Sequence, residues 1–496
     1  MTRIRVELPE GLAEGLCEDG VRRFYSLPYA APMTSDRRFR APQPPLPWEG
    51  VRDATTPGPR APQAASAPIE ERLEVEALMG APTAEGPDYL TLNVFAPEAP
   101  QAPCPVMVFI HGGSFVAGGK DAAIYDGTAF GRDGVVCVVI NYRLGIEGFL
   151  PLADAPTNLG LRDMIAALAW VRDRIALFGG DPGAVTLFGE SGGAYCTAAL
   201  ITSPLANTLF HRAICQSGHA LVSRPLEVMQ RLTRRVARRL RVSPDRAGIL
   251  SAGIPRMLAA QAAVLRPSLL HDMRDDEGRD PSFGITKFLP VHGDDVLPLP
   301  CLEALAQGAG AHIDLLIGAT SEEAALFFAP RGVQDRLGRL AAIWFMSRAL
   351  PDARAALRAY GLDRKGEKPG RVLSRAMTDL MFRHMARRTA ERHRGRAWVY
   401  EFDWRSPALE GDLGAAHAME LPFVFDTLAA ASGERGLTGP APPQELADFV
   451  HRLWIGFART GEAPWPAWDA GSREVFSLTR RTAQHEPVMP AAAFLP

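Results

Sequence analysis

The sequence predicts an α/β protein with a central, mostly parallel β-sheet flanked by helices. Three segments of strand length in the first half of the chain, residues 105–110, 135–140 and 185–188, are almost continuously apolar. Strands covered on both faces in a parallel sheet have this composition, whereas strands with one wet face alternate. Residues 158–178 carry an apolar stripe at helical spacing between the second and third segments. The order strand, helix, strand is that of a βαβ unit.

Two further strands are expected later in the chain, at residues 313–317 and 397–402. Residues near 225–265 and 331–394 show helical patterns with little strand signal, so we expect helical insertions that lie over the edge of the sheet. The proline-rich segments are interpreted as surface loops, because strands on both sides are needed to complete one fold. Residues 1–496 are therefore predicted to form a single domain.

The composition is that of an ordinary globular protein, at 47% hydrophobic and 22% charged residues over 496 positions. The formal net charge of -2 predicts no general attraction to nucleic acid or to anionic lipid. Arginines are dense between residues 331 and 400, with Arg383 and Arg387 among them. We interpret this stretch as a solvated helix, because no aromatic side chains interleave the arginines as they do on nucleic-acid-binding faces.

Six cysteines are spread along the chain without close pairs or a CxxC spacing, which predicts neither a zinc site nor a disulfide framework. The first residues alternate polar and apolar and lack the apolar core of a signal peptide. No apolar run approaches the length that spans a bilayer. We expect a cytoplasmic protein that needs no metal or cofactor and does not associate with membranes.

The apolar run 184–188 ends abruptly on Gly-x-Ser-x-Gly, with Ser191 at the centre and helix-forming residues beyond. This is the pattern of a nucleophile elbow, in which a serine is held on a sharp turn between a strand and a helix. The crowded backbone requires small neighbours two positions away, and Gly189 and Gly193 meet that need. Such a serine needs a base, a carboxylate to orient the base, and donors for the developing oxyanion.

Residues 111–115, His-Gly-Gly-Ser-Phe, follow the first predicted strand directly. With Ser191 in place, this segment resembles the oxyanion loop of esterases, where small residues let backbone N–H groups face the substrate carbonyl. The alternative is a purely structural turn.

Together these motifs resemble the type-B carboxylesterase family, which has the α/β-hydrolase fold and includes para-nitrobenzyl esterases, mammalian carboxylesterases and cholinesterases. The resemblance runs through nearly the whole chain and is strongest toward the bacterial para-nitrobenzyl esterases. It rests on ordered segments at 28–32 (PYAAP), 48–55 (WEGVRDAT), 90–94 (LTLNV), 141–145 (NYRLG), 178–182 (FGGDP), 216–218 (QSG) and 414–423 (GAAHAMELPF).

The resemblance implies the remaining catalytic residues. The family's acid falls on Glu323 in residues 318–324, with Glu322 as its solvated neighbour, and the base falls on His417. The order Ser, Glu, His is the one this fold requires. The implied oxyanion donors are the backbone N–H groups of Gly113, Ser114 and Gly192. His111 is expected to hold the oxyanion loop rather than to move protons.

The sequence departs from the family pattern at three places. Ser114 stands where a third glycine is common, which adds a side chain close to the pocket, and Gly192 replaces a common alanine. The cysteines of the family's early disulfide are replaced by Ala61 and Tyr89. The loss of that disulfide is consistent with a reducing compartment.

The predicted activity is hydrolysis of small to medium, largely apolar carboxylic esters through an acyl-enzyme. Carbamate or amide hydrolysis on the same triad is one alternative, and a non-catalytic binding protein is another. The acyl pocket is predicted near Phe115, Phe327, Phe423 and Phe425, with ordinary core packing as the alternative for each. We expect a monomer, with weak self-association as the alternative, and a small-molecule ester as its partner.

Overall fold

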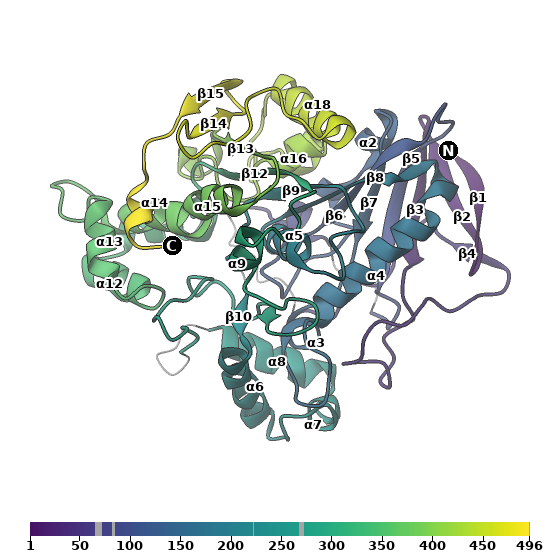
Figure 1. The fold of residues 1–496 in the computed structure, drawn as a ribbon, viewed down its shortest axis with the longest axis horizontal. Helices are drawn as coiled ribbons and strands as arrows, with labels where there is room; N and C mark the ends of the chain where they lie inside the picture. Colours follow the sequence, from purple (N-terminus) through teal and green to yellow (C-terminus); the bar gives the residue numbers. More distant parts are fainter. Residues whose placement is uncertain (65–71, 82–84, 222, 267–271, 496) are drawn as a thin grey trace.

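A large twisted sheet runs through the centre of the computed structural model, which describes residues 1–64, 72–81, 85–221, 223–266 and 272–495 (Figure 1). Over these residues the strands are β1 (Thr2–Leu8), β2 (Gly11–Glu18), β3 (Val21–Pro28), β4 (Val51–Asp53), β5 (Thr91–Pro97), β6 (Cys104–Ile110), β7 (Val136–Ile140), β8 (Gly180–Glu190), β9 (Arg212–Gln216), β10 (Arg224–Pro225), β11 (Val291–His292), β12 (Asp314–Thr320), β13 (Ala397–Phe402), β14 (Glu474–Ser477) and β15 (Thr482–His485).

The strand order in the main sheet is β1-β2-β3-β5-β7-β6-β8-β9-β12-β13-β14-β15, with β4 beside β2. The central strands from β7 to β14 are parallel, whereas β1, β2, β3 and β5 add antiparallel pairs at one edge and β15 adds one at the other. The short strands β10 and β11 pair separately. Because parallel strands all end at the same edge, the loops after β6, β8 and β12 lie near one another.

Helices connect and cover these strands. They are α1 (Glu76–Met79), α2 (Thr128–Arg132), α3 (Gly145–Phe149), α4 (Leu159–Arg174), α5 (Gly192–Thr202), α6 (Leu226–Leu240), α7 (Arg246–Ser251), α8 (Gly253–Leu265), α9 (Cys301–Ala306), α10 (Ala325–Phe328), α11 (Val333–Arg336), α12 (Arg339–Ser347), α13 (Ala353–Ala359), α14 (Pro369–Thr378), α15 (His384–Arg392), α16 (Leu421–Val424), α17 (Leu428–Ala431) and α18 (Gln444–Thr460). A π-helical turn, η3 (Asp379–Arg383), joins α14 to α15.

The central strands are buried on both faces. Along β6, Val106 and Val108 belong to a core shared with α4 and α5, whereas Met107 and Phe109 belong to a second core shared with α16 and α18. Successive strand residues point to opposite faces, so each face needs its own apolar set, and the two sets together give the continuous apolar run. A third core lies among α12, α14 and α15.

The five strands expected from the sequence are confirmed as β6, β7, β8, β12 and β13, and the expected helix as α4. The antiparallel strands β1, β2 and β3 and the parallel strand β9 were missed. Both regions expected to be helical insertions contain helices, α6 to α8 in the first and α11 to α15 in the second. Within the described residues, no helix combines the length and apolar character that crossing a bilayer requires.

The arginine-rich stretch differs from the expected solvated helix. The Arg387 side chain is 5% exposed and pairs with Glu401 at 3.0 Å and Glu486 at 2.8 Å. Arg383 pairs with the same two carboxylates and with Asp379. These arginines therefore anchor α15 and η3 to β13 and to the chain after β15, which a helical pattern alone does not reveal.

A fully buried ion pair joins the end of β7 to α4. Arg143 contacts both oxygens of Asp163, with Nη2 at 2.6 Å from Oδ1 and Nε at 2.8 Å from Oδ2, and neither side chain is exposed. The backbone N–H of Arg143 donates to Asp163 as well, and its Nη1 donates to the carbonyl of Arg40. Two-point geometry and extra hydrogen bonds are what make a buried pair tolerable.

Asp163→Asn should lower the free energy of unfolding by about 3–5 kcal/mol, because it leaves the Arg143 charge buried without a counter-charge. Asp173→Asn is the matched control on the same helix, since its partner Arg172 and Asp173 itself are 56% and 46% exposed. The control should cost no more than about 1 kcal/mol. Urea unfolding measures both, and equal losses would contradict a special role for the buried pair.

Candidate active site

Ser191 lies on the turn between β8 and α5. Its backbone has φ 52° and ψ -120°, a strained conformation for a residue with a side chain. A Cβ on Gly193 would lie 1.9 Å from the carbonyl oxygen of Ile110, and one on Gly189 would lie 2.5 Å from the Gly193 carbonyl carbon. Both glycines are therefore required by backbone packing, as the elbow pattern predicts.

Hydrogen bonds hold this turn against the sheet. The Ser191 N–H donates to the carbonyl of Gln216 at the end of β9, at 2.9 Å, and the Ser191 carbonyl accepts from Tyr195 N–H, also at 2.9 Å. The first bond ties the turn to the neighbouring strand, and the second starts α5. The serine side chain is thereby presented at the carboxyl edge of the sheet.

His417 and Glu323 are brought into contact from segments far apart in the chain. His417 Nδ1 lies 2.5 Å from Glu323 Oε2, and both side chains are buried. The other Glu323 oxygen accepts from the N–H of Thr320 at 2.7 Å, so the carboxylate is fixed at the end of β12. The rings of Phe327 and Phe382 pack against His417, with centroids 5.5 and 4.9 Å away.

Glu322, the neighbour of Glu323, has different contacts. Its carboxylate lies 2.5 Å from Arg405, accepts from the N–H of Ala415, and is 33% exposed. Of the two adjacent glutamates, Glu323 is thus the one in contact with the imidazole.

The loop 111–117 lies against the elbow. A Cβ on Gly112 would meet Glu190 Oε2 at 2.5 Å and Ser191 Cβ at 3.1 Å, and one on Gly113 would meet the carbonyl oxygen of Ala117 at 2.0 Å. The backbone nitrogen of Ser114 lies 3.5 Å from the position that a Cβ on Gly192 would take. Within the described residues, the N–H groups of Gly113 and Ser114 donate to no backbone or side-chain acceptor.

Gly192 adds a third N–H, because the first residues of a helix have no intrahelical acceptor. Gly113, Ser114 and Gly192 therefore present backbone donors from two neighbouring segments. Ser114 itself adopts φ 54°, the left-handed region that a glycine occupies more easily. Its carbonyl accepts from Thr286 Oγ1 at 2.9 Å, which helps to hold the loop in this conformation.

The His111 side chain helps to hold the loop 111–117 in place. Its Nδ1 lies 2.8 Å from the Gly112 carbonyl, and its ring stacks on Tyr142 at 4.5 Å between centroids. Burial lowers the pKa of His111 to about 4, so the ring is neutral at pH 7. These contacts suit the structural role expected for this histidine.

A narrow cavity of about 30 Å³, here called the inner cavity, opens onto Ser191. Phe115 and Phe327 line it, as expected, together with Ser114, Tyr195, Leu221, Pro281, Ser282, Ile285, Thr286, Leu289, Met381 and Phe382. Its wall is mostly apolar. The second helical insertion thus reaches the site, through η3, whereas helices α6 to α8 of the first do not line this cavity.

Phe423 and Phe425 do not line the inner cavity. Phe423 packs against Phe402 and Trp404, and the Phe425 ring lies 4.9 Å from that of Phe109. Both side chains are fully buried. The chain turns into α16 shortly after His417, which directs these rings into the core beneath the sheet.

The turn η3 carries two of the residues that meet the site, Met381 and Phe382. A π-helical turn breaks the regular hydrogen-bond spacing of a helix. His219 Nε2 lies 2.7 Å from the carbonyl oxygen of Met381, and the His219 ring packs edge-on against Tyr195. The turn is thereby fixed beside the inner cavity.

Two buried glutamates near His417 were missed. Glu190 Oε1 lies 3.1 Å from His417 Nε2, and Glu420 accepts from Gln216 Nε2 at 3.2 Å. Burial raises the pKa of both carboxyls above the ordinary value, and the Glu323 charge raises both further. One sequence signal could have indicated Glu190: it is a charged residue at the end of an apolar strand.

The charges of the neighbouring carboxylates change the pKa of the His417 imidazole. Burial alone lowers the pKa of His417, but the negative charges of Glu190 and Glu323 outweigh burial and raise it above the ordinary value.

Among the described residues, no group of three or more histidine, cysteine, aspartate or glutamate side chains is arranged to hold a metal ion. The site consists of a serine, an imidazole, three carboxylates and backbone donors.

Comparison with known proteins identifies the family. The carboxylesterase family model matches residues 3–491. A para-nitrobenzyl esterase of Bacillus subtilis (strain 168) is 34% identical, over 98% of this chain and 97% of that protein. A phenmedipham hydrolase of Pseudarthrobacter oxydans is also 34% identical, over 95% and 94%.

Solved structures agree with the sequence comparison. A PNB esterase is similar with a TM-score of 0.82 at 32% identity, over 100% of both chains. A carboxylesterase of Geobacillus stearothermophilus has a TM-score of 0.81 at 32% identity, over 99% of both chains. The fold is the α/β-hydrolase fold. The chain belongs to the carboxylesterase family and is a carboxylic ester hydrolase.

Gly193→Ala should lower the free energy of unfolding by about 3 kcal/mol or more, because its Cβ would collide with the backbone of Ile110 and neither backbone can yield cheaply. Gly192→Ala is the control at the adjacent position, where a Cβ would lie 3.4 Å from its nearest neighbour, Phe115 N. Urea unfolding should show less than about 1 kcal/mol of change for the control. Equal stabilities would contradict the packing requirement at Gly193.

Proposed function

We propose that the enzyme hydrolyses small to medium, largely apolar carboxylic esters through an acyl-enzyme on Ser191, with His417 as the base and Glu323 as its orienting carboxylate. One observation carries the proposal. The serine on the strained turn lines a mostly apolar cavity together with Phe327 and Phe382, and the same two rings pack against the imidazole held by Glu323. This combination is needed for acyl transfer and for little else.

In the first half-reaction, His417 Nε2 removes the Ser191 proton as Oγ attacks the ester carbonyl, and the imidazolium then protonates the leaving alcohol. In the second half-reaction a water molecule takes the place of the alcohol and releases the acid. Glu323 keeps the proton on Nδ1, so that Nε2 is the nitrogen that accepts. Its fixed contact with Thr320 N–H maintains this orientation.

The developing oxyanion is stabilised by the backbone N–H groups of Gly113, Ser114 and Gly192. They are available because Gly113 and Ser114 donate to no described acceptor and Gly192 begins α5. The positive end of that helix adds favourable potential. Donors fixed before the reaction lower the barrier because they need no reorganisation when charge develops.

Carbamate or amide hydrolysis is the second candidate, because the same nucleophile and base attack any activated carbonyl. The specific observation in its favour is a relative at 34% identity, the phenmedipham hydrolase, which is a carbamate hydrolase. Turnover of 4-nitrophenyl butyrate, of a 4-nitrophenyl carbamate and of butyryl 4-nitroanilide separates the three chemistries. We expect the highest kcat/KM for the ester.

We further propose that residues 1–496 act as one catalytic domain, as a monomer in the cytoplasm. One sheet runs from β1 to β15 through nearly the whole chain. All six cysteines are free and buried, an arrangement that suits a reducing compartment.

Ser191→Ala should lower kcat for 4-nitrophenyl butyrate by a factor of about 10⁴ or more, because no nucleophile remains. Ser217→Ala is a matched control, since Ser217 is buried on the neighbouring turn after β9 and also has a positive φ, of 53°. The control should keep most of its activity. Esterase activity that survives Ser191→Ala in a folded protein would overturn the assignment.

Glu190→Gln should shift the acidic limb of the kcat/KM–pH profile to lower pH, by about one unit. The base works only when His417 is neutral, so kcat/KM rises as the pH passes the His417 pKa. The Glu190 charge raises that pKa, and its removal lowers it. A stopped assay from pH 5 to 10 measures the midpoint.

The control for this experiment is Glu303→Gln, an exposed glutamate on α9 that accepts from Gln307 and does not contact His417. Its midpoint should equal that of the wild type. A Glu190→Gln profile with an unchanged or higher midpoint would show that Glu190 does not set the titration of the base.

A further inference from the structure

A second and larger cavity, here called the outer cavity, shares a wall with the inner cavity. Its volume is about 240 Å³. Residues 280–287 form the shared wall: Asp280, Phe283, Gly284 and Lys287 line the outer cavity, whereas Pro281, Ser282, Ile285 and Thr286 line the inner one. Thr286 also holds the Ser114 carbonyl. A molecule bound in the outer cavity would therefore contact the same short segment, residues 280–287, that forms part of the wall beside Ser191.

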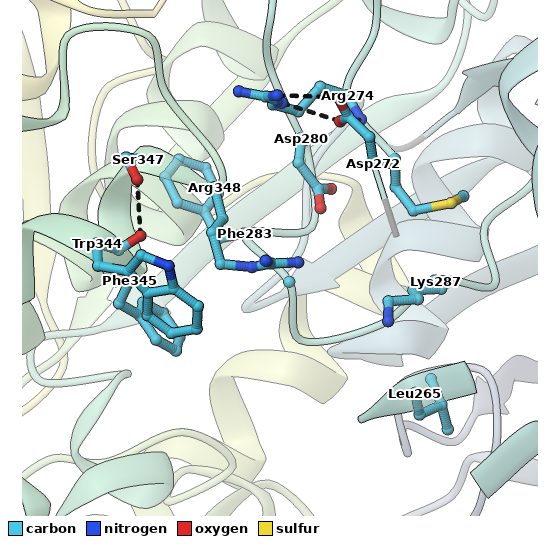
Figure 2. Close-up of a pocket in the computed structure, with 12 residues that line it drawn as sticks. Leu265, Asp272, Arg274, Asp280, Phe283, Lys287, Trp344, Phe345, Ser347 and Arg348 are labelled. Carbon is cyan, nitrogen blue, oxygen red and sulfur yellow. Dashed lines mark hydrogen bonds and ion pairs between the residues drawn. The ribbon is translucent and has the colours of Figure 1, made fainter. Parts of the chain in front are cut away.

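Trp344, Phe345 and Arg348 line the outer cavity on one side, from α12 and its carboxyl end, and the paired Asp272 and Arg274 lie on the other (Figure 2). The two carboxylates of the cavity are already compensated. Asp272 pairs with Arg274 at 2.8 Å, and Asp280 pairs with the buried Arg224 at 2.6 Å. Acidic charge in the cavity is thus neutralised.

Arg348 has no such partner. Its guanidinium lies over the Trp344 ring, 5.4 Å from the centroid, and among the described residues it forms no ion pair with a carboxylate. Stacking on an aromatic face orients a guanidinium while leaving its N–H edge open to an acceptor. The Arg348 charge also acts on Lys287: burial and the Arg348 charge together lower the pKa of Lys287 to about 8.

Helix α6 extends this positive charge over the surface beside the cavity. Arg231 Nη1 donates to the carbonyl of Arg274, which lines the cavity, at 3.3 Å. The basic face of α6 consists of Arg231, Arg234, Arg235, Arg238 and Arg239, with Arg241 just after the helix. Within the described part of the chain, none of these six forms an ion pair with a carboxylate.

The net charge of the whole chain is only -2, so this positive charge is local. Arg383 and Arg387, equally dense in sequence, are neutralised by carboxylates. Uncompensated arginines are therefore gathered beside one cavity, where they raise the local concentration of anions.

We propose that the outer cavity binds the anionic group of a small molecule, a carboxylate or a phosphate, with Arg348 as its principal ligand and the basic face of α6 attracting it. The volume suits a group smaller than a drug-sized ligand. A guanidinium pre-oriented on Trp344 offers two parallel N–H bonds to a planar carboxylate or to a phosphate. The shared wall places that anion beside the inner cavity.

Such an anion has two sources. It is either a free metabolite-sized anion or the charged end of the ester substrate itself, and the second source rests on the function proposed above. Both need the same residues. Binding and turnover measurements together distinguish them.

The binding test is isothermal titration of the wild-type protein with glutarate and, separately, with inorganic phosphate at low ionic strength. We expect binding at one site per chain, weakened about tenfold or more by Arg348→Gln. Arg354→Gln is the matched control, because Arg354 is an exposed arginine on the neighbouring helix α13 without an ion pair to any described carboxylate. Thermal unfolding confirms that both variants fold.

Arg348→Lys provides a second, milder variant. It keeps the charge but loses the paired N–H donors, so its affinity for glutarate should lie between those of the wild type and Arg348→Gln. The proposal is overturned if neither anion binds the wild type, if Arg348→Gln binds as well as the wild type, or if Arg354→Gln weakens binding equally.

The turnover test compares the mono-4-nitrophenyl ester of glutarate with the neutral 4-nitrophenyl butyrate. If the anion belongs to the substrate, Arg348→Gln lowers kcat/KM for the glutarate ester about tenfold and leaves butyrate turnover unchanged. If the anion is free, added glutarate alters butyrate turnover in the wild type but not in Arg348→Gln. A wild type that binds glutarate yet hydrolyses neither ester overturns the proposed function and leaves the anion site standing.

Discussion

The close approach of backbone to backbone at the turn after β8 is the constraint on which the rest of the site depends. The chain at Gly193 touches the end of β6 at Ile110, where the oxyanion loop begins, and the N–H of Ser191 is bonded to the end of β9. Three neighbouring parallel strands are thereby locked together at their carboxyl ends. The proposed nucleophile and the proposed backbone donors are thus held close to one another by main-chain contacts, to which the side chains of Thr286 and His111 add further hydrogen bonds.

The proposed base, His417, is controlled by the charges around it. His417 is buried, and burial disfavours an imidazolium, but carboxylates on two sides favour it. Glu323 contacts Nδ1 and Glu190 contacts Nε2, while Glu420 lies behind them and is bonded to Gln216, which itself accepts from Trp454. The electrostatic balance at the imidazole is therefore set by groups contributed from β8, from the segment after β12 and from the turn that precedes α16.

The central strands could be predicted from sequence because burial on both faces leaves a continuous apolar run, as in β6 and β7. The serine was predictable because its turn demands glycines at fixed spacing. Glu323 and His417 required resemblance to a family, since no local pattern links residues 94 positions apart. Glu190 and Glu420 were not predicted as part of the site, because an isolated buried charge leaves no periodic pattern in the sequence. Phe423 and Phe425 were misplaced, because proximity in sequence to His417 says nothing of the direction in which α16 turns.

The π-helical turn η3 has a consequence for how this enzyme can change over evolutionary time. A π turn arises when one residue is inserted into an α-helix, and an α-helix advances about 100° per residue. Loss of a single residue from 379–383 would restore a continuous helix and rotate either α14 or α15 by that angle. Met381 and Phe382 would then face elsewhere, and the wall over His417 would be rebuilt in one step. A change of length in η3 would thus reshape the wall of the site in a single step, whereas a point substitution would alter one side chain at a time.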